Sequence, residues 1–382
     1  MARAYQADIW VRPGFVFNEG QLIKDAVLGI AEGKIEAVMG RDQIPASAKA
    51  MEMEGILTPG FVDLQVNGGG GVLLNDQPTP EALRTIAAAH RGFGTTSILP
   101  TVITDRPDVL AAAAEAMISL GHSRAMPGLH IEGPHISKAR RGTHAPEFIR
   151  PIEASTTRLI QDLIDSGLAV LITVAPEAVA VKDISRLVEM GAKVSLGHSA
   201  ADAATTQAAL VAGATCFTHL FNAMPHMENR APGIAGAAIS SDAWCGIIAD
   251  GVHVDPLMVA MACRARPVPH RMIAVSDSMA TVGGPDTFVL YGQEIRLDGN
   301  KLVNAEGSLA GAHLTLAEAL SNLIGYGVPE VDALRMCRKN PAELMGLGSM
   351  ARMVGTPAEE LVLLNGDYTV QSIGMSEMAS SA

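Results

Sequence analysis

From about residue 56 onward, short apolar runs alternate with longer, alanine-rich segments. Short apolar runs bounded by small or turn residues favour buried strands, and the longer segments between them can form crossover helices. Eight parallel strands joined by helices predict an α/β fold, a (β/α)8 barrel of the TIM type. The predicted strands are Ile56–Val66, Thr95–Thr101, Gly128–Glu132, Val170–Val174, Lys193–His198, Thr215–His219, Cys245–Asp250 and Met272–Asp277.

The two ends of the chain follow a different pattern. Ala26–Ile30 and Ile35–Val38 flank Glu32-Gly33, which predicts a hairpin, and a second short strand over Leu361–Leu364 precedes the turn residues Asn365-Gly366. We therefore expect a small β-sandwich domain built from residues 1–55 and 346–382, with the barrel inserted between them at residues 56–345.

Composition excludes several classes of partner. The 382 residues contain 28 Lys and Arg against 40 Asp and Glu, a formal net charge of −12, and no run of basic residues. This balance argues against binding to nucleic acid or to an anionic membrane surface. Aromatic residues make up 4% of the chain, too few for a base-stacking platform. An anionic substrate would have to be held by a few local basic side chains.

Cysteine usage and the N-terminal sequence indicate the compartment. Cys216, Cys245, Cys263 and Cys337 form no Cys-x-x-Cys pair, which is typical of buried thiols in a reducing environment. The first eight residues lack the apolar core of a signal peptide, and no apolar run reaches the length of about 18 residues that a bilayer requires. We expect a soluble, cytoplasmic protein.

Polar side chains stand at the carboxyl ends of the predicted strands, where a barrel carries its reactive groups. They are Gln65 and Asn67, Glu132, His198, His219, Asp250 and Asp277. A single histidine at such a position is more often a hydrogen-bonding core residue than a ligand. Glu132, His198 and His219 together offer a carboxylate and two imidazoles, the ligand set of a catalytic zinc site with one position open for water.

Asp277 has two possible roles at this edge of the barrel. It could be a fourth ligand, or a free carboxylate that accepts a proton from water on the metal. A salt bridge is a poor alternative, because residues 274–278 contain no basic side chain. His90, His122 and His270 fall in helical or loop segments and are expected at the surface.

Other motifs carry less chemistry. The run from Asn67 to Gly71 lacks the Gly-Lys-Ser/Thr of a nucleotide-binding loop and predicts a tight turn. The Gly-x-Ser-x-Gly of a serine hydrolase is absent. Ser199, with Asp202 three residues later, resembles a capping box and predicts a helix that starts there and stops at Gly213.

Several motifs together are similar to a known family. Glu132-Gly133-Pro134, Gly142-Thr143-His144 and Gly197-His198-Ser199 resemble the amidohydrolase superfamily. The segments Thr218–Pro225, with Asn222-Ala223-Met224-Pro225, and Ala249–His253 resemble its N-acetylglucosamine-6-phosphate deacetylase family. Pro59–Asp63 and Gly307–Gly311 fit the same family. The resemblance therefore spans nearly the whole chain in order.

This resemblance implies an activity and a set of roles. The reaction would be metal-dependent hydrolysis of the acetamide of N-acetyl-D-glucosamine 6-phosphate to D-glucosamine 6-phosphate and acetate. The implied metal ligands are Glu132, His198 and His219; Asp277 would be general base and then general acid, and His144 would hold the developing oxyanion. The implied substrate contacts are Thr143, His144, Asn222, Ala223, Leu309, Ala310 and Gly311 for the sugar, and Arg230 and His253 for the phosphate, partly across a homodimer interface.

One departure from the superfamily pattern limits the metal count. Many members carry His-x-His at the end of the first strand, where this chain has Gln65 and Asn67, and no lysine follows Thr173-Val174 to bridge two metals. We expect one divalent ion per subunit. Zinc suits two nitrogens and a carboxylate, and iron, manganese or cobalt are alternatives.

Three other functions are compatible with the sequence to different degrees. The substrate could be the galactosamine epimer, because the orientation of one hydroxyl group leaves no sequence signature. A cyclic-amide amidohydrolase is less favoured, because the second-metal residues are missing and phosphate-type residues are present. A non-catalytic assembly protein would have no use for the four polar strand-end residues Glu132, His198, His219 and Asp277.

Overall fold

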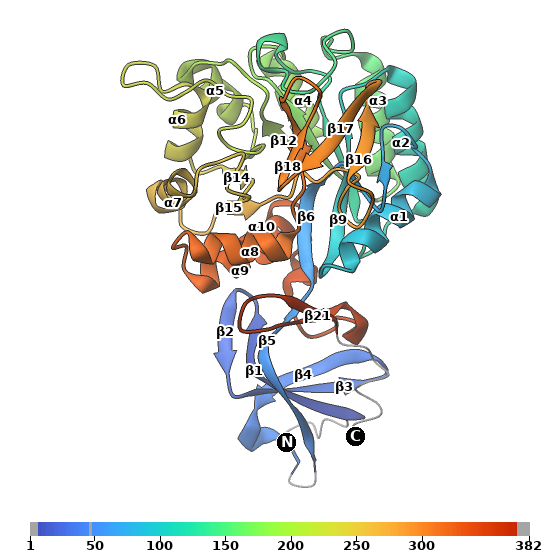
Figure 1. The fold of residues 1–382 in the computed structure, drawn as a ribbon, viewed down its shortest axis with the longest axis vertical. Helices are drawn as coiled ribbons and strands as arrows, with labels where there is room; N and C mark the ends of the chain where they lie inside the picture. Colours follow the sequence, from blue (N-terminus) through green and yellow to red (C-terminus); the bar gives the residue numbers. More distant parts are fainter. Residues whose placement is uncertain (1–6, 46–47, 373–382) are drawn as a thin grey trace.

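The structure is a computed structural model that describes residues 7–45 and 48–372. It has a barrel of parallel strands and a smaller sheet below it (Figure 1). The barrel strands, in hydrogen-bonding order, are β6 (Phe61–Val66), β9 (Thr95–Ile103), β10 (Gly128–Glu132), β11 (Ala169–Val174), β12 (Lys193–Leu196), β13 (Cys216–Phe217), β14 (Trp244–Ile247) and β15 (Met272–Ala274). Each of the eight predicted segments overlaps one of these strands, and the predicted barrel is confirmed.

Short contacts after β15 close the ring of strands. The backbone N–H of Asp277 donates to the carbonyl of Gln65 at 3.0 Å, and Val66 forms an isolated parallel bridge with Ser278. The last strand end is thereby joined to the first. Asp277 and Gln65, which are 212 residues apart in the chain, lie side by side at the open edge of the barrel.

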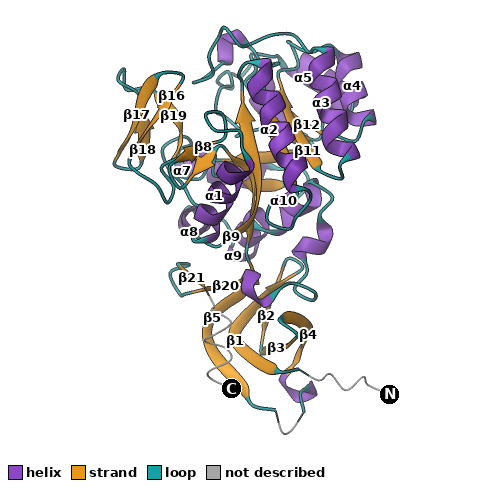
Figure 2. Ribbon diagram, turned by 90° about the vertical axis from the view of Figure 1, so that its right-hand side faces the viewer, coloured by secondary structure: helices purple, strands orange, loops and turns teal. Residues whose placement is uncertain are grey.

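Helices cover the outside of the barrel (Figure 2). Each buries an apolar stripe, as α4 does with Ile184 and Leu187 three residues apart. The helices that connect barrel strands are α1 (Pro80–Arg91), α2 (Pro107–Leu120), α3 (Ala154–Asp165), α4 (Val181–Glu189), α5 (Ala203–Val211), α6 (Gly233–Ser240) and α7 (Pro256–Ala265). After the barrel follow α8 (Leu316–Gly325), α9 (Glu330–Cys337) and α10 (Lys339–Leu344), and short 3-10 turns occur at Arg41–Gln43, Lys138–Arg140, Gly348–Ala351 and Ala358–Glu360.

Strands from both ends of the chain build the smaller sheet. They are β1 (Ile9–Asn18), β2 (Gln21–Lys24), β3 (Ala26–Ala31), β4 (Lys34–Gly40), β5 (Ala50–Pro59), β20 (Leu361–Leu364) and β21 (Val370–Ser372). β20 pairs antiparallel with β5, and the sheet encloses an apolar core of its own that includes Val16, Leu28 and Leu361. The β-rich domain expected from both chain ends is therefore present; its predicted part beyond residue 372 lies outside the described residues.

The strand predicted over Ile56–Val66 is two strands of different sheets. β5 ends at Pro59 in the smaller sheet, and β6 begins at Phe61 in the barrel. Gly60 separates them, and a Cβ atom at Gly60 would come within 2.3 Å of the Thr96 side chain. Only glycine leaves room for the chain to pass this close to Thr96. One continuous apolar run therefore forms strands of two different sheets with no linker between them.

A further sheet packs at the barrel's open edge. It consists of the antiparallel strands β16 (Thr287–Leu290), β17 (Gln293–Asp298), β18 (Lys301–Val303) and β19 (Leu309–Ala312), here called the roof sheet. Its buried residues Leu290, Ile295 and Leu302 belong to one cluster with Ile103 at the end of β9. Nearby, β7 (Gly68–Gly69) and β8 (Val72–Leu73) form a small hairpin, which is the tight turn predicted for the glycine run.

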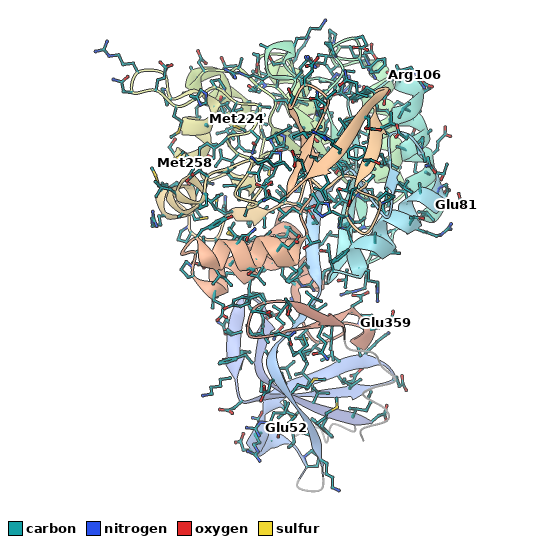
Figure 3. All side chains as sticks on the ribbon, viewed as in Figure 1. Glu52, Glu81, Arg106, Met224, Met258 and Glu359 are labelled. Carbon is teal, nitrogen blue, oxygen red and sulfur yellow. The ribbon has the colours of Figure 1, made fainter. Side chains whose placement is uncertain are left out.

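Charged side chains project outward, as Glu52, Glu81, Arg106 and Glu359 do in Figure 3. Within residues 7–45 and 48–372, no helix is long and apolar enough to cross a bilayer. All four cysteines are free thiols. Burial raises the pKa of Cys216 to about 11, so that thiol stays protonated and unreactive.

Candidate metal centre and active site

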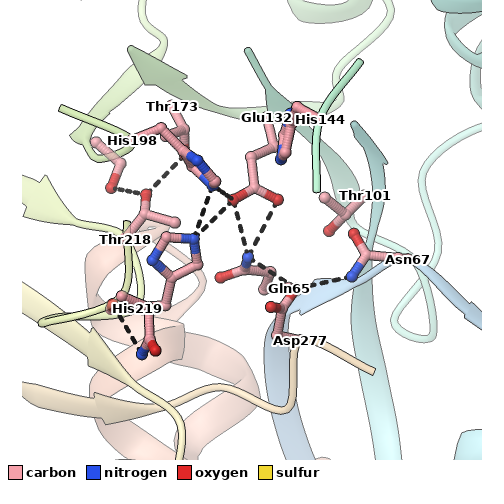
Figure 4. Close-up of polar contacts among 12 residues, drawn as sticks. Gln65, Asn67, Thr101, Glu132, His144, Thr173, His198, Thr218, His219 and Asp277 are labelled. Carbon is pink, nitrogen blue, oxygen red and sulfur yellow. Dashed lines mark hydrogen bonds and ion pairs between the residues drawn. The ribbon is translucent and has the colours of Figure 1, made fainter. Parts of the chain in front are cut away.

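Three side chains converge at the carboxyl ends of the barrel strands (Figure 4). Glu132 is the last residue of β10, and His198 and His219 follow β12 and β13. Oε1 of Glu132 lies 3.1 Å from Nε2 of His198 and 3.1 Å from Nε2 of His219, and the two Nε2 atoms are 3.0 Å apart. Among the described residues no second group of this kind is found.

The donor set suits a divalent cation. Nδ1 of His198 lies 3.0 Å from the carbonyl oxygen of Arg140, so its N–H donates there and Nε2 is the nitrogen left to bind a metal. Burial alone would raise the pKa of Glu132, but His198 and His219 hold that pKa well below its ordinary value. An ionised carboxylate beside two imidazole nitrogens matches the ligands of a zinc-type site.

The backbone at these strand ends is unusual in a consistent way. His198, His219 and Asp277 have φ values of 47°, 29° and 51°. Residues other than glycine rarely adopt this left-handed region, and when they do they cluster at functional sites. The shared turn immediately after a strand brings all three side chains to the same edge of the barrel.

Gln65 joins the metal-ligand group to Asp277. Its Nε2 lies 3.1 Å from both carboxylate oxygens of Glu132 and 3.0 Å from Oδ1 of Asp277. Asn67 Nδ2 donates to the same Oδ1 at 2.7 Å. Sequence reasoning identified Gln65 and Asn67 only as replacements for histidine ligands. The absence of a basic neighbour to Asp277 was the available signal that neutral amides must supply its donors.

Asp277 is a partly buried carboxyl group with an altered pKa. Burial, and then the negative charge of Glu132, raise this pKa to about 6, although the hydrogen bond from Asn67 opposes the shift. Oδ1 receives both amide donors, so Oδ2 is the oxygen left for a water molecule or substrate. A carboxyl group of this kind can both accept and return a proton near neutral pH.

His144 stands next to the ligand group. Its ring centroid is 4.3 Å from that of His198, and its Nδ1 lies 2.7 Å from the hydroxyl oxygen of Thr104. Burial, and then the neighbouring His198, lower the pKa of His144 well below its ordinary value. His144 is therefore a neutral imidazole.

A cavity of about 180 Å³ brings most of the predicted site residues together. Its lining is Asn67, Ile103, Glu132, Gly142, Thr143, His144, His198, His219, Asn222, Ala223, His253, Asp277, Met279, Leu309 and Gly311. Ala310 is the predicted substrate contact between two lining residues, yet its own side chain is buried in the roof sheet. Alternation along a strand accounts for this, since Leu309 and Gly311 face the opposite side.

The two residues expected to bind the phosphate differ in their position relative to the cavity. His253 lines the cavity, and its Nδ1 pairs with Asp250. Arg230 is exposed in the loop between β13 and α6 and is not part of the cavity lining. Within one chain the structure therefore brings His253, but not Arg230, to the site.

Two expectations about polar residues were wrong. His90 is buried, not at the surface, because its Nε2 lies 2.9 Å from the carbonyl oxygen of Gly68 and so fixes the glycine turn. Ser199 is not a helix cap, because its hydroxyl donates to Glu177 at 2.6 Å. Asp202 caps α5 instead, accepting from the backbone N–H of Thr205.

Comparison with known proteins identifies the family to which the chain belongs. Residues 56–352 match the Amidohydrolase family. The chain belongs to the amidohydrolase family. This amidohydrolase is 38% identical over 372 residues to the N-acetylgalactosamine-6-phosphate deacetylase of Shewanella sp. (strain ANA-3), covering 94% of this chain and 92% of that one. It is 34% identical over 341 residues to the N-acetylglucosamine-6-phosphate deacetylase of Haemophilus influenzae, covering 87% and 88%.

Solved structures give a similar result. The N-acetylglucosamine-6-phosphate deacetylase of Pasteurella multocida superposes on this amidohydrolase with a TM-score of 0.87 at 31% identity, covering 95% of this chain and 97% of that one. The resemblance inferred from the motifs is thus confirmed over almost the full length.

Proposed function

We propose that this amidohydrolase hydrolyses the acetamide of N-acetyl-D-glucosamine 6-phosphate, giving D-glucosamine 6-phosphate and acetate. One observation carries the proposal. The side-chain nitrogen of Gln65 donates hydrogen bonds both to Glu132, one of the three metal-ligand candidates, and to the carboxyl group of Asp277 that would accept the proton. Amide hydrolysis needs these two elements within one cavity, together with a donor for the oxyanion.

Glu132, His198 and His219 would hold one divalent ion, for which zinc is the first choice. When bound, such an ion acidifies water and polarises a carbonyl oxygen. Gln65 and Asn67 are engaged as donors to carboxylates, which favours a single metal per subunit.

Asp277 would move the proton. Its Oδ2 takes a proton from the water molecule that attacks the acetamide carbon, and later gives that proton to the nitrogen. The C–N bond then breaks to release a neutral amine, because an unprotonated amide nitrogen is a poor leaving group. A pKa of about 6 is suited to both transfers.

The remaining cavity residues would orient the sugar. His144 would donate to the carbonyl oxygen as negative charge develops there. Thr143, Asn222, Ala223 and the backbone at Leu309–Gly311 would contact the ring. His253 would bind the phosphate from the same chain, and Arg230 from a second copy, which requires a homodimer. We also propose that the enzyme acts in the cytoplasm.

A second candidate substrate is N-acetylgalactosamine 6-phosphate, favoured by the 38% identity to the Shewanella enzyme of that name. The deciding experiment measures acetate release by zinc-loaded protein from both phosphorylated epimers and from unphosphorylated N-acetylglucosamine. We expect the glucosamine 6-phosphate derivative to have the highest kcat/KM. A higher kcat/KM for the galactosamine epimer would mean that this epimer is the substrate. No acetate release from any of the three sugars would point to cyclic amides as substrates instead.

A further inference from the structure

Thr104 is the first residue after β9 and is fully buried. Its hydroxyl oxygen has two neighbours, Nδ1 of His144 at 2.7 Å and the carbonyl oxygen of Glu132 at 3.3 Å. Within the described part of the chain, Nδ1 of His144 has no other hydrogen-bond partner. The protonation of this ring nitrogen is therefore decided by one hydroxyl group.

That hydroxyl has a single proton to give. A separation of 2.7 Å is usual for an O–H donor, whereas 3.3 Å is longer than the ordinary range for O–H to oxygen. We therefore assign the proton of Thr104 to the shorter contact, the one with Nδ1 of His144. Because a neutral imidazole has one N–H, an acceptor at Nδ1 places the hydrogen on Nε2.

Nε2 of His144 is available to a ligand. No residue in the described ranges forms a hydrogen bond with it, and the ring lines the same cavity as Glu132 and Asp277. The Nε2–H tautomer presents a donor to that cavity. The other tautomer would present a lone pair, which repels an oxygen that is gaining negative charge.

We propose that Thr104 is a positioning residue that fixes His144 as the Nε2–H tautomer, so that this ring supplies an N–H donor to the substrate carbonyl oxygen. The catalytic consequence rests on the proposed function, whereas the tautomer itself does not. Thr104 acts through His144 and does not touch the substrate.

The surroundings of Thr104 hold it in place. Tyr291 of the roof sheet donates its hydroxyl to the backbone carbonyl of Thr104. The preceding residue, Ile103, is bonded through both its N–H and its C=O to the side chain of Asn75, each at 3.0 Å. Gly133 packs so closely that a Cβ there would lie 2.2 Å from the Thr104 hydroxyl oxygen. The position of the Thr104 hydroxyl oxygen is therefore set by the fold.

The test compares Thr104→Val, which keeps the shape and loses the hydroxyl, with Thr104→Ser, which keeps the hydroxyl. Zinc-loaded proteins labelled with 15N in histidine are studied by long-range 1H–15N correlation, and the His144 signals are assigned by their loss in His144→Gln. We expect Nε2 to be protonated and Nδ1 unprotonated in the wild type and in Thr104→Ser, with a mixture of tautomers in Thr104→Val.

Activity provides the second measurement. We expect kcat of Thr104→Val to fall about 10- to 100-fold with little change in KM, because removal of an oxyanion donor costs about 100- to 1,000-fold and the variant retains part of the correct tautomer. Thr104→Ser should stay near wild type. A wild-type spectrum with Nδ1 protonated, or a Thr104→Val spectrum identical to wild type, overturns the proposal. The wild-type spectrum decides even if Thr104→Val does not fold, and lack of activity on every sugar would overturn only the proposed function.

Discussion

Oδ2 of Asp250 lies 2.6 Å from Nδ1 of His253. Oδ1 of the same carboxylate accepts the backbone N–H groups of Val252 and His253 at 2.9 and 2.8 Å. Burial would raise the pKa of Asp250, but the hydrogen bond from His253 keeps it below its ordinary value. An ionised Asp250 thus fixes both the loop and the ring, and Nε2 of His253 is the nitrogen left to face the cavity.

Replacing Asp250 by Asn should weaken binding of the phosphorylated sugar. A hydrogen bond to a charged group contributes about 1.5–3 kcal/mol, which corresponds to about a 10- to 100-fold change. We expect kcat/KM for the phosphorylated sugar to fall by about that factor, mainly through KM, with little effect on the unphosphorylated sugar. Asp255→Asn, at the exposed N-cap of α7, is the matched control. Equal losses on both sugars would argue against a phosphate role for His253.

Asp277→Asn should separate proton transfer from metal binding. The amide cannot accept the proton of the attacking water, and general acid–base catalysis is worth about 100- to 10,000-fold. We expect kcat to fall in that range while metal analysis finds the same stoichiometry as in the wild type. Turnover close to the wild-type rate would remove Asp277 from the mechanism.

Glu132→Gln should lose the metal. A neutral amide is a much weaker zinc ligand than a carboxylate, so both bound metal and activity should disappear. Zinc should raise the melting temperature of the wild type, since a ligand at 100 times its Kd stabilises a protein by about 2.7 kcal/mol. Differential scanning calorimetry with and without zinc tests this, and a zinc-dependent shift of the same size in Glu132→Gln would contradict the ligand assignment.

Asp63 should make stability depend on pH. Its Oδ1 accepts the backbone N–H groups of Gln65 and Ser276, and burial raises its pKa from 3.8 to about 7. The folded state therefore binds a proton between about pH 4 and pH 7 that the unfolded state has released, so the free energy of unfolding falls as pH rises through this window. Full expression of the shift corresponds to about 4 kcal/mol.

Asp63→Asn cannot titrate, so it should lose this part of the pH dependence. Urea unfolding of both proteins at pH 5 and pH 8 measures the effect, because the difference between the two proteins isolates Asp63 from other titrating groups. We expect the variant to gain stability relative to the wild type on going to pH 8. An unchanged difference between the two pH values would mean that Asp63 is ionised throughout.

The barrel and the ligand group were predictable for a geometric reason. Buried parallel strands are nearly continuous apolar runs, and their carboxyl ends share one edge of the barrel, so Glu132, His198 and His219 had to approach one another. Asp277 followed from the same argument. The choice between ligand and proton acceptor needed the amide donors Gln65 and Asn67, which only the structure places.

Other features could not be predicted because their causes are tertiary. The apolar run at Ile56–Val66 continues through Gly60. There the chain passes from the smaller sheet into the barrel, at a point where Thr96 leaves no room for a side chain. His90 is buried by the glycine turn that it supports. The roof sheet was missed, although the turn sequence Asp298-Gly299-Asn300 is a hairpin signal that could have revealed β17 and β18.

The pairing of β20 with β5 has a consequence for synthesis of the chain. β5 leaves the ribosome roughly 300 residues before β20, so one of its edges has no partner during most of translation. At about 5–20 residues per second, that interval is roughly 15–60 s. An unpaired strand edge is a template for aggregation. We therefore expect the yield of folded protein to depend on chaperone supply and on the speed of translation.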